Sequence, residues 1–200
     1  MRTLVFATSN PGKKKELEAL LGPGWIVKSA ADFPDVPEVE EDQPTFEGNA
    51  AKKAHAFAEA TGLLALADDS GLCVDALDGR PGVQSARYAP GTDGDRIAKL
   101  LGELKDVPSS QRTARFVCAL CLATPDGKET FTRGTCEGRI IDAPRGANGF
   151  GYDPVFELPN GKTMAELTRD EKSAVSHRGA AFRAMLAKIL PLPQRGRGPG

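Results

Sequence analysis

The fold is decided by the segment RTARFVCALCLATPDGKETFTRGTCEGRII, residues 112–141 in the middle of the chain. Its first part, 112–124, contains an uninterrupted apolar run of the kind found in buried strands. The connection Pro125-Asp126-Gly127-Lys128 suits a type I turn that begins at Thr124, with proline at its second position and glycine at its fourth. Residues 129–141 then return as a second strand. The segment therefore predicts a long β-hairpin.

Strands and helices alternate outward from this hairpin. Hydrophobic spacing predicts strands at 2–8, 25–29 and 63–67, and helices at 13–21, 45–61, 93–106 and 173–190. Thr45 is the expected N-cap of the second helix, and Gly62 ends it. Residues 31–44 hold three prolines and are expected to form a long loop, as is the Gly- and Asp-rich segment 69–88.

This order of elements predicts a mixed α/β fold, because helices interleave with strands early while a hairpin dominates the middle. We expect an elongated mixed sheet flanked by helices, in two lobes with a cleft between them. Residues 1–190 are expected to form this single domain, and 191–200 a disordered tail.

Composition excludes several classes of protein. With 26 Lys+Arg against 27 Asp+Glu in 200 residues, the chain has no global basic field for nucleic-acid binding. No apolar run approaches the roughly 20 residues that a membrane helix needs, and the N-terminal apolar stretch is too short for a secretory leader. The four cysteines fit a compartment in which thiols stay reduced, so we expect a cytoplasmic protein.

The pair Cys118 and Cys121 has the spacing of a redox or zinc site. It lies in the apolar strand, however, where residues three apart point to opposite faces. A zinc site also needs a second Cys/His pair, which the sequence does not supply. Buried core cysteines are the favoured interpretation.

The first strand leads into a short polar loop that precedes a helix. Its residues are Thr8, Ser9, Asn10, Pro11, Gly12 and Lys13. Free backbone N–H groups and the helix dipole favour an anion at such a position, so the loop is a candidate phosphate site. It lacks the full P-loop pattern. In the alternative interpretation Ser9 or Asn10 is only an N-cap and Lys13 lies on a solvated face.

Acidic residues cluster in two places. The segment 32–42 has six carboxylates without a Lys or Arg, which indicates either a cation site or a soluble acidic loop. Asp68 and Asp69 follow an apolar strand and precede a glycine turn, so we expect them at the carboxyl edge of that strand, where ligands bind in α/β folds. Adjacent side chains diverge, and the two acids are expected to have different roles.

Two further segments could contact a ligand beyond the candidate phosphate site. Phe150, Gly151, Tyr152 and Asp153 combine aromatic rings with close backbone approach, which suits a wall for stacking a base or, alternatively, an ordinary turn with two core anchors. Lys172, His177 and Arg178 gather hydrogen-bond donors at the expected start of the last helix.

Taken together, these segments resemble the inosine triphosphate pyrophosphatase family, whose bacterial members remove deaminated purine nucleotides. The resemblance rests on the motifs at 8–13, 45–54, 68–75, 81–88, 149–154, 165–167 and 171–179, in this order along most of the chain. Ser9 departs from the pattern, since relatives often have glycine there.

The resemblance implies hydrolysis of a nucleoside triphosphate to the monophosphate and pyrophosphate, with Mg²⁺ and attack of water on the α-phosphorus. It implies that the 8–13 loop and Lys53 hold the triphosphate, and that Asp69 is the proton acceptor. It further implies metal ligands among Glu40, Glu41, Asp68 and Asp69. The base and sugar site would consist of Ser70, Phe150, Gly151, Tyr152, Asp153, Lys172, His177 and Arg178. The resemblance also implies a homodimer. Donation to the 6-oxo group by His177 or Arg178 would disfavour ATP. A nucleotide sensor and a pyrophosphatase for modified pyrimidines remain the alternatives.

Overall fold

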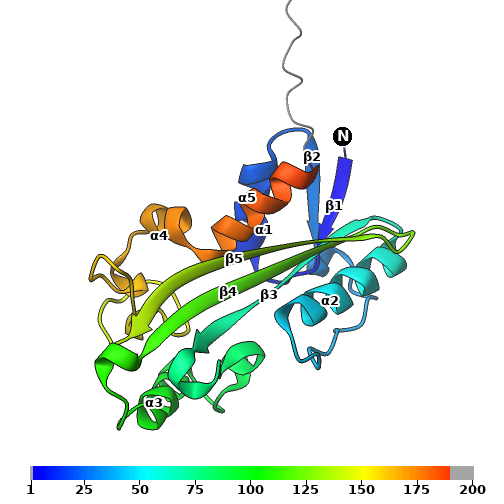
Figure 1. Cartoon of the computed structure of the whole chain (residues 1–200). Helices are drawn as coiled ribbons and strands as arrows, with labels where there is room; N and C mark the ends of the chain where they lie inside the picture. The colour runs from blue at the N-terminus through cyan, green and yellow to red at the C-terminus, as the bar shows by residue number, and fades with distance from the viewer. Residues whose placement is uncertain (1, 190–200) are drawn as a thin grey trace, which may run out of the picture.

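The computed structural model describes residues 2–189, and one six-stranded sheet runs through them (Figure 1). The strands are β1 (Arg2–Phe6), β2 (Trp25–Ser29), β3 (Leu64–Val74), β4 (Thr113–Ala123), β5 (Glu129–Ile140) and β6 (Phe156–Glu157), in the order β2-β1-β3-β4-β5-β6. The pairs β1–β2 and β1–β3 are parallel, and the others are antiparallel. The predicted mixed sheet is confirmed.

The predicted hairpin forms the long antiparallel part of this sheet. The strands β4 and β5 pair along their whole length, from Thr113 opposite Arg139 to Ala123 opposite Glu129. The Gly127 N–H donates to the Thr124 carbonyl at 3.0 Å, as the proposed turn requires. Cys118 and Cys121 are buried in cores on opposite faces, as expected for core cysteines.

Helices cover both faces of the sheet. They are α1 (Pro11–Leu21), α2 (Phe46–Thr61), α3 (Asp93–Glu103), α4 (Arg169–Val175) and α5 (His177–Ile189). Helix α2 packs its alanines on one face, whereas α1 and α5 pack larger side chains such as Leu17 and Phe182 on the other (Figure 1). A third core surrounds Leu100 of α3 at the far end of the long strands.

The third strand is longer than the sequence predicts. We expected it to end at 67 and a loop to begin at 69, but β3 continues to Val74. The glycine at 71 does not make a turn: a Cβ there would lie 2.4 Å from the Gly82 carbonyl oxygen, so glycine permits a close approach of two backbones. The apolar strand β4 offers a partner along this whole stretch, and pairing overrides the local preference.

The predicted last helix is two helices. Ser176 has extended backbone angles and ends α4, and its Oγ accepts a hydrogen bond from the Gly179 N–H at 3.1 Å. It therefore acts as a cap for α5. Lys172 consequently belongs to α4, while His177 and Arg178 begin α5, so the expectation that all three begin the last helix is wrong.

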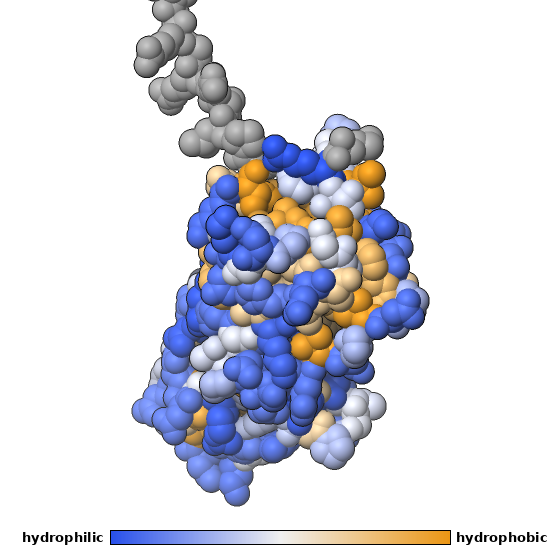
Figure 2. Space-filling view, turned by 90° about the vertical axis from the view of Figure 1, so that its right-hand side faces the viewer, coloured by the Kyte–Doolittle hydropathy of each residue, from blue (hydrophilic) through white to orange (hydrophobic). Residues whose placement is uncertain are grey.

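The surface is uneven in character. Figure 2 shows apolar side chains gathered in the upper half of one face and hydrophilic side chains over most of the lower half. Within residues 2–189, no helix is long and apolar enough to cross a membrane. The tail predicted at 191–200 lies outside the described residues.

Candidate active site

The cleft forms where the sheet opens beside β3. Strand β1 pairs with β3 only from Leu4 opposite Leu64 to Phe6 opposite Leu66, and the chain then turns away into α1. The next residues of β3 face a cleft of about 1010 Å³ on this side. Asp68 and Asp69 point to opposite faces of the strand, yet both line the cleft. Strand β1 does not pair with this part of β3, so the cleft reaches both faces of the strand at its open edge. They lie within β3 and not at its end, which corrects the predicted position.

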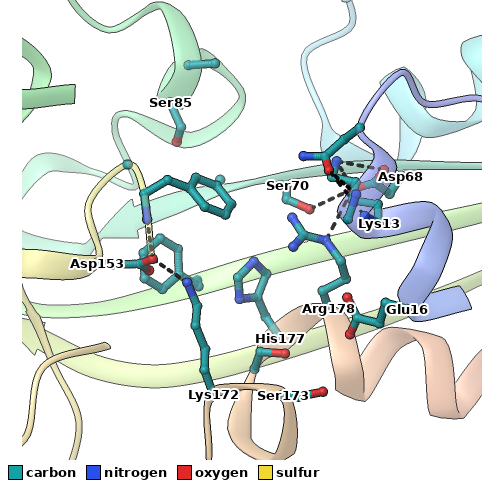
Figure 3. Close-up of a pocket in the computed structure, with 18 of the residues that line it drawn as sticks. Lys13, Glu16, Asp68, Ser70, Ser85, Asp153, Lys172, Ser173, His177 and Arg178 are labelled. Carbon is teal, nitrogen blue, oxygen red and sulfur yellow. Dashed lines mark hydrogen bonds and ion pairs between the residues drawn. The ribbon is translucent and has the colours of Figure 1, made fainter. Parts of the chain in front are cut away.

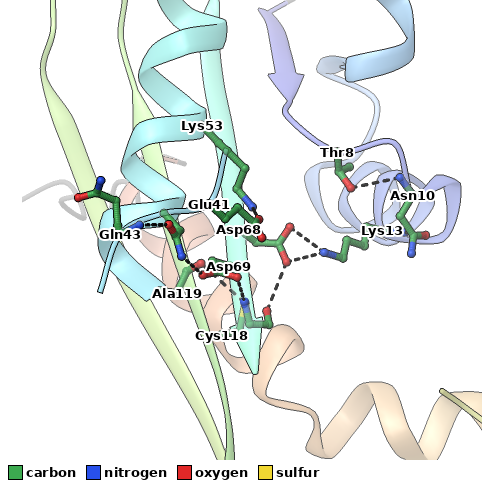
Figure 4. Close-up of polar contacts among 12 residues, drawn as sticks. Thr8, Asn10, Lys13, Glu41, Gln43, Lys53, Asp68, Asp69, Cys118 and Ala119 are labelled. Carbon is green, nitrogen blue, oxygen red and sulfur yellow. Dashed lines mark hydrogen bonds and ion pairs between the residues drawn. The ribbon is translucent and has the colours of Figure 1, made fainter. Parts of the chain in front are cut away.

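The loop before α1 brings a lysine to Asp68. The Asn10 side chain caps the helix by accepting hydrogen bonds from the N–H groups of Gly12 and Lys13, so the predicted N-cap is confirmed. Lys13 does not lie on a solvated face: its Nζ is 2.7 Å from Asp68 Oδ2. Thr8 stabilises the loop by accepting a hydrogen bond from the Asn10 N–H at 3.2 Å, and Ser9 is exposed (Figure 4).

Asp68 is the anionic partner of two cations. Besides Lys13, Nε of Arg178 lies 3.8 Å from Asp68 Oδ2, and the Ser70 hydroxyl donates to the same oxygen at 3.3 Å. Burial alone would raise the pKa of Asp68, but the charges of Lys13 and Arg178 outweigh it and lower the pKa to about 2. This carboxylate therefore holds both cations at the edge of the cleft (Figure 3).

Asp69 has a different environment on the opposite face of β3. Its Oδ2 accepts a hydrogen bond from Asn49 Nδ2 at 2.9 Å, and its Oδ1 accepts one from the Ser70 N–H at 2.8 Å. Burial raises the pKa of Asp69, and the negative charge of Glu41 raises it as well. The hydrogen bond from Asn49 lowers the pKa, but the net shift is upward. Asp69 is thus a better proton acceptor than an ordinary aspartate.

The acidic loop contributes Glu41 to the same region. Its carboxylate contacts Lys53 of α2 and lies 3.2 Å from Nη1 of Arg87. Burial raises the pKa of Glu41, but Lys53 and Arg87 lower it by a larger amount. The net pKa lies below the ordinary value, so the group stays ionised at neutral pH. Glu40 is exposed and is not part of the cleft wall.

The other end of the cleft presents an exposed aromatic ring beside a partly buried charged pair. Phe150 is 61% exposed, and Nζ of Lys172 lies 4.9 Å from the centre of its ring. Asp153 is buried, contacts Lys172, and accepts a hydrogen bond from the Phe150 N–H at 2.9 Å. Tyr152 is also buried and packs in the core, with its hydroxyl donating to the Ser85 carbonyl at 2.9 Å. Gly151 is fixed by donating its N–H to Asp93.

His177 lies between the two ends of the cleft (Figure 3). Its ring stacks on Phe116 with centroids 5.1 Å apart, and burial lowers its pKa to about 3, so the ring is neutral at neutral pH. His177 Nδ1 and Arg178 Nε are buried atoms without a hydrogen-bond partner within the described residues. Buried polar atoms are rarely left without partners, so these two are available to a ligand.

Known proteins are similar in sequence to this chain over nearly its full length. A model described as the Ham1 family matches residues 4–188. The chain belongs to the Ham1 family. A relative from Exiguobacterium sp., named dITP/XTP pyrophosphatase, is 55% identical over 190 residues, which cover 94% of this chain and 97% of the relative. One of the same name from Symbiobacterium thermophilum is 47% identical, with 98% of each chain covered.

Solved Ham1-family structures share the fold. The structure of a HAM1 protein from Coxiella burnetii has a TM-score of 0.90 and 42% identity, and covers 94% of this chain and 98% of its own. A nucleoside-triphosphatase / dITP/XTP pyrophosphatase from Mycobacterium abscessus has a TM-score of 0.80 and 46% identity, and covers 95% of this chain and 100% of its own. The family resemblance drawn from the motifs is confirmed.

Sequence reasoning assigned no role to two residues of this Ham1-family site. Asn49 is fully buried and binds Asp69, and Arg87 binds both the side chain and the carbonyl of Glu41. A signal was available for Asn49, because it is a polar residue on the apolar face that Phe46 and Ala50 mark on α2. Arg87 carries no such signal, since its partner is 46 residues away.

A divalent cation fits Glu41 and Asp69 better than the other acids. Asp68 contacts Lys13 and Arg178, and Glu41 contacts Lys53 and Arg87, whereas the hydrogen-bond donors to Asp69 are neutral, so Asp69 is the acid that lacks a cation in direct contact. The negative charge of Glu41 also raises the pKa of Asp69, and a cation beside both groups would relieve this repulsion. Within the described residues there is no group of three or more His, Cys, Asp or Glu that could hold a metal. Mg²⁺ commonly uses only one or two carboxylates and takes its other ligands from water and substrate phosphates, so the pair fits it.

Proposed function

We propose that this Ham1-family chain hydrolyses the deaminated purine nucleotides ITP, dITP and XTP to the monophosphate and pyrophosphate. One observation carries the proposal: a single cleft is lined by Lys13, Asp69 and Glu41 toward one end and by Phe150 and Lys172 toward the other, and within the described residues His177 Nδ1 and Arg178 Nε lie between them without hydrogen-bond partners. That arrangement matches a triphosphate, a water to be activated and a purine base. Removal of such nucleotides cleanses the nucleotide pool.

The cationic end holds the triphosphate. Lys13 and Lys53 neutralise negative charge on the phosphate oxygens, and this charge redistributes as the α-phosphoryl bond breaks. The proposed phosphate loop comprises Thr8, Ser9, Asn10, Pro11 and Gly12, of which Asn10, Pro11 and Gly12 line the cleft. Asp68 keeps the Lys13 ammonium aimed at the cleft before the substrate arrives.

Asp69 orients the attacking water and accepts its proton. The water oxygen forms a bond to the α-phosphorus, the bond from that phosphorus to the bridging oxygen breaks, and pyrophosphate leaves. Mg²⁺ held by Glu41 and Asp69 would neutralise phosphate charge and lower the pKa of water.

The base end provides the selectivity. Phe150 offers a face for stacking, while Ser70, Gly151, Tyr152, Asp153 and Lys172 surround the base and sugar. A 6-oxo group accepts hydrogen bonds from His177 or Arg178, whereas the 6-amino group of adenine cannot. We infer that GTP is disfavoured because its 2-amino group meets an unsuitable edge of the pocket. A mismatch of this kind costs a few kcal/mol.

The assembly and location are further parts of the proposal. We propose a cytoplasmic homodimer, with support from the reduced cysteines and from the family resemblance. Size-exclusion chromatography with light scattering tests the dimer, and a monomeric mass at micromolar concentration would contradict it.

The test of the function is pyrophosphate release from ITP, dITP, XTP, GTP and ATP at equal concentration, with Mg²⁺ and with EDTA. We expect turnover of the inosine and xanthosine nucleotides that EDTA abolishes, with ATP and GTP nearly inert. Turnover of modified pyrimidine nucleotides instead would keep the chemistry and overturn the selectivity. Binding without turnover would indicate a sensor.

A further inference from the structure

Asn49 is a buried amide on a helix face that is otherwise apolar. Its side chain is 0% exposed and lies between Phe46 and Ala50 on the side of α2 that packs against the sheet. A buried amide without partners is costly, so both of its ends should be hydrogen-bonded. Asn49 does not line the cleft, and its contacts must explain why it is there.

The contacts of Asn49 have a fixed direction. Its Oδ1 accepts a hydrogen bond from the Gln43 N–H at 2.9 Å, and its Nδ2 donates to Asp69 Oδ2 at 2.9 Å (Figure 4). A backbone N–H can only donate, so the amide oxygen must face Gln43 and the amide nitrogen must face Asp69. One side chain thus joins the acidic loop to the strand.

This link connects the two acids of the site. Gln43 lies two residues after Glu41 in the loop, while Asp69 lies on β3. On its other side Glu41 is held by Lys53 and Arg87. Asn49 is therefore the group that sets the Asp69 carboxylate relative to the loop that carries Glu41.

We propose that Asn49 is a positioning residue that holds Asp69 and the Glu41 loop in register for hydrolysis. The inference rests on the proposed function, in which these two acids hold the cation and orient the water. Asn49 acts through Asp69 and Gln43 without touching the substrate. Loss of such a supporting partner commonly costs about 10- to 100-fold in metal affinity or activity.

The first experiment uses Asn49→Ser, which is smaller and cannot reach both partners, and Glu47→Gln as a matched control. Glu47 lies in the same turn of α2, but it binds Arg133 at 2.8 Å, outside the cleft. We expect Asn49→Ser to lower kcat for dITP by about 10- to 100-fold with KM within about threefold. We also expect weaker Mn²⁺ binding, measured by electron paramagnetic resonance with pyrophosphate present. Glu47→Gln should change neither quantity.

A wild-type kcat and Mn²⁺ affinity in folded Asn49→Ser would overturn the proposal. A fall in kcat that only follows the folded fraction in a denaturant titration would also overturn it, because that result indicates a purely structural role.

A second experiment exchanges the donor and the acceptor. Asn49→Asp places two carboxylates face to face, and Asp69→Asn places two amides there. The double variant restores a single hydrogen bond, because Asn at 69 can donate to Asp at 49 while still accepting from the Ser70 N–H. We expect its loss of stability to be smaller than the sum of the single losses, and additive losses would contradict the contact.

The two proposals can fail separately. If the wild type releases no pyrophosphate from any deaminated nucleotide, the proposed function fails. The stability cycle and the Mn²⁺ titration would still decide whether Asn49 couples the two acids.

Discussion

The two sides of β3 present neighbouring aspartates to very different surroundings. Asp68 faces α1 and α5, where Lys13 and Arg178 compensate its charge, while Asp69 faces α2, where its hydrogen-bonding side-chain partner is the neutral Asn49. Burial acts on both groups, yet the pKa falls for Asp68 and rises for Asp69. The difference shows that charge compensation, and not burial alone, separates an acid that stays ionised beside two cations from one whose affinity for a proton is raised.

The largest effect is expected from Asp69→Asn. The amide keeps the shape of the side chain but cannot accept a proton from water, so turnover of dITP should fall by about 10³-fold. Nucleotide binding, measured by isothermal titration calorimetry without added Mg²⁺, should remain within about threefold because Lys13, Lys53 and Arg178 are unchanged. Wild-type turnover in this variant would exclude Asp69 as the proton acceptor.

The matching change on the other side, Asp68→Asn, should act on stability. It leaves Lys13 and Arg178 beside a neutral amide. Because these cations lower the folded pKa of Asp68 to about 2, linkage predicts a loss of roughly 2–3 kcal/mol in the free energy of unfolding at neutral pH. Denaturant titration measures this value. A loss equal to or below that of Asp69→Asn would remove the contrast between the two faces.

The two acids should also affect the pH dependence of stability with opposite sign. The folded pKa of Asp68 is lowered, so its contribution is fully present above its ordinary value of 3.8 and is lost as pH falls toward about 2. The raised pKa of Asp69 works the other way, because stability decreases as pH rises above 3.8 through its folded pKa. Unfolding curves between pH 2 and 6 should therefore flatten at the acid end in Asp68→Asn. An unchanged acid limb would contradict the assigned compensation.

The smallest effect is expected at His177. Its pKa of about 3 means that it stays neutral between pH 5 and 8, so the preference for ITP over ATP should not change across this range. Nitrogen-15 spectra of the imidazole at pH 5 test the charge directly. A spectrum typical of a charged imidazole at pH 5 would contradict the lowered pKa of His177 and would make this part of the cleft cationic, like the end that holds Lys13.

Local patterns predicted those parts of the fold that depend on neighbouring residues. The hairpin, the Thr45 cap and the Gly62 stop of α2 all follow from adjacent residues and are confirmed. The extension of β3 could not be predicted in this way, because the Asp-Asp-Ser-Gly sequence favours a turn and only pairing with β4 makes it a strand. The break at Ser176 was missed because helical periodicity continues across it.

The site was predicted as a set of residue types more than as a geometry. The motifs identified Lys13, Asp68 and Arg178, but not that one acid pairs with both cations from segments far apart in the chain. Sequence order also could not separate the neighbouring acids Glu40 and Glu41, of which only the second lines the cleft. Such distinctions arise from packing between distant elements.

The open edge of β3 has one more consequence. Among the described residues, no strand pairs with 67–71 on the side of β1, and such an unpaired edge can join with a strand of another molecule. Here the edge lies inside a cleft, and charged side chains flank it on both faces. The charged side chains that we propose to bind the nucleotide would thereby also disfavour edge-to-edge aggregation.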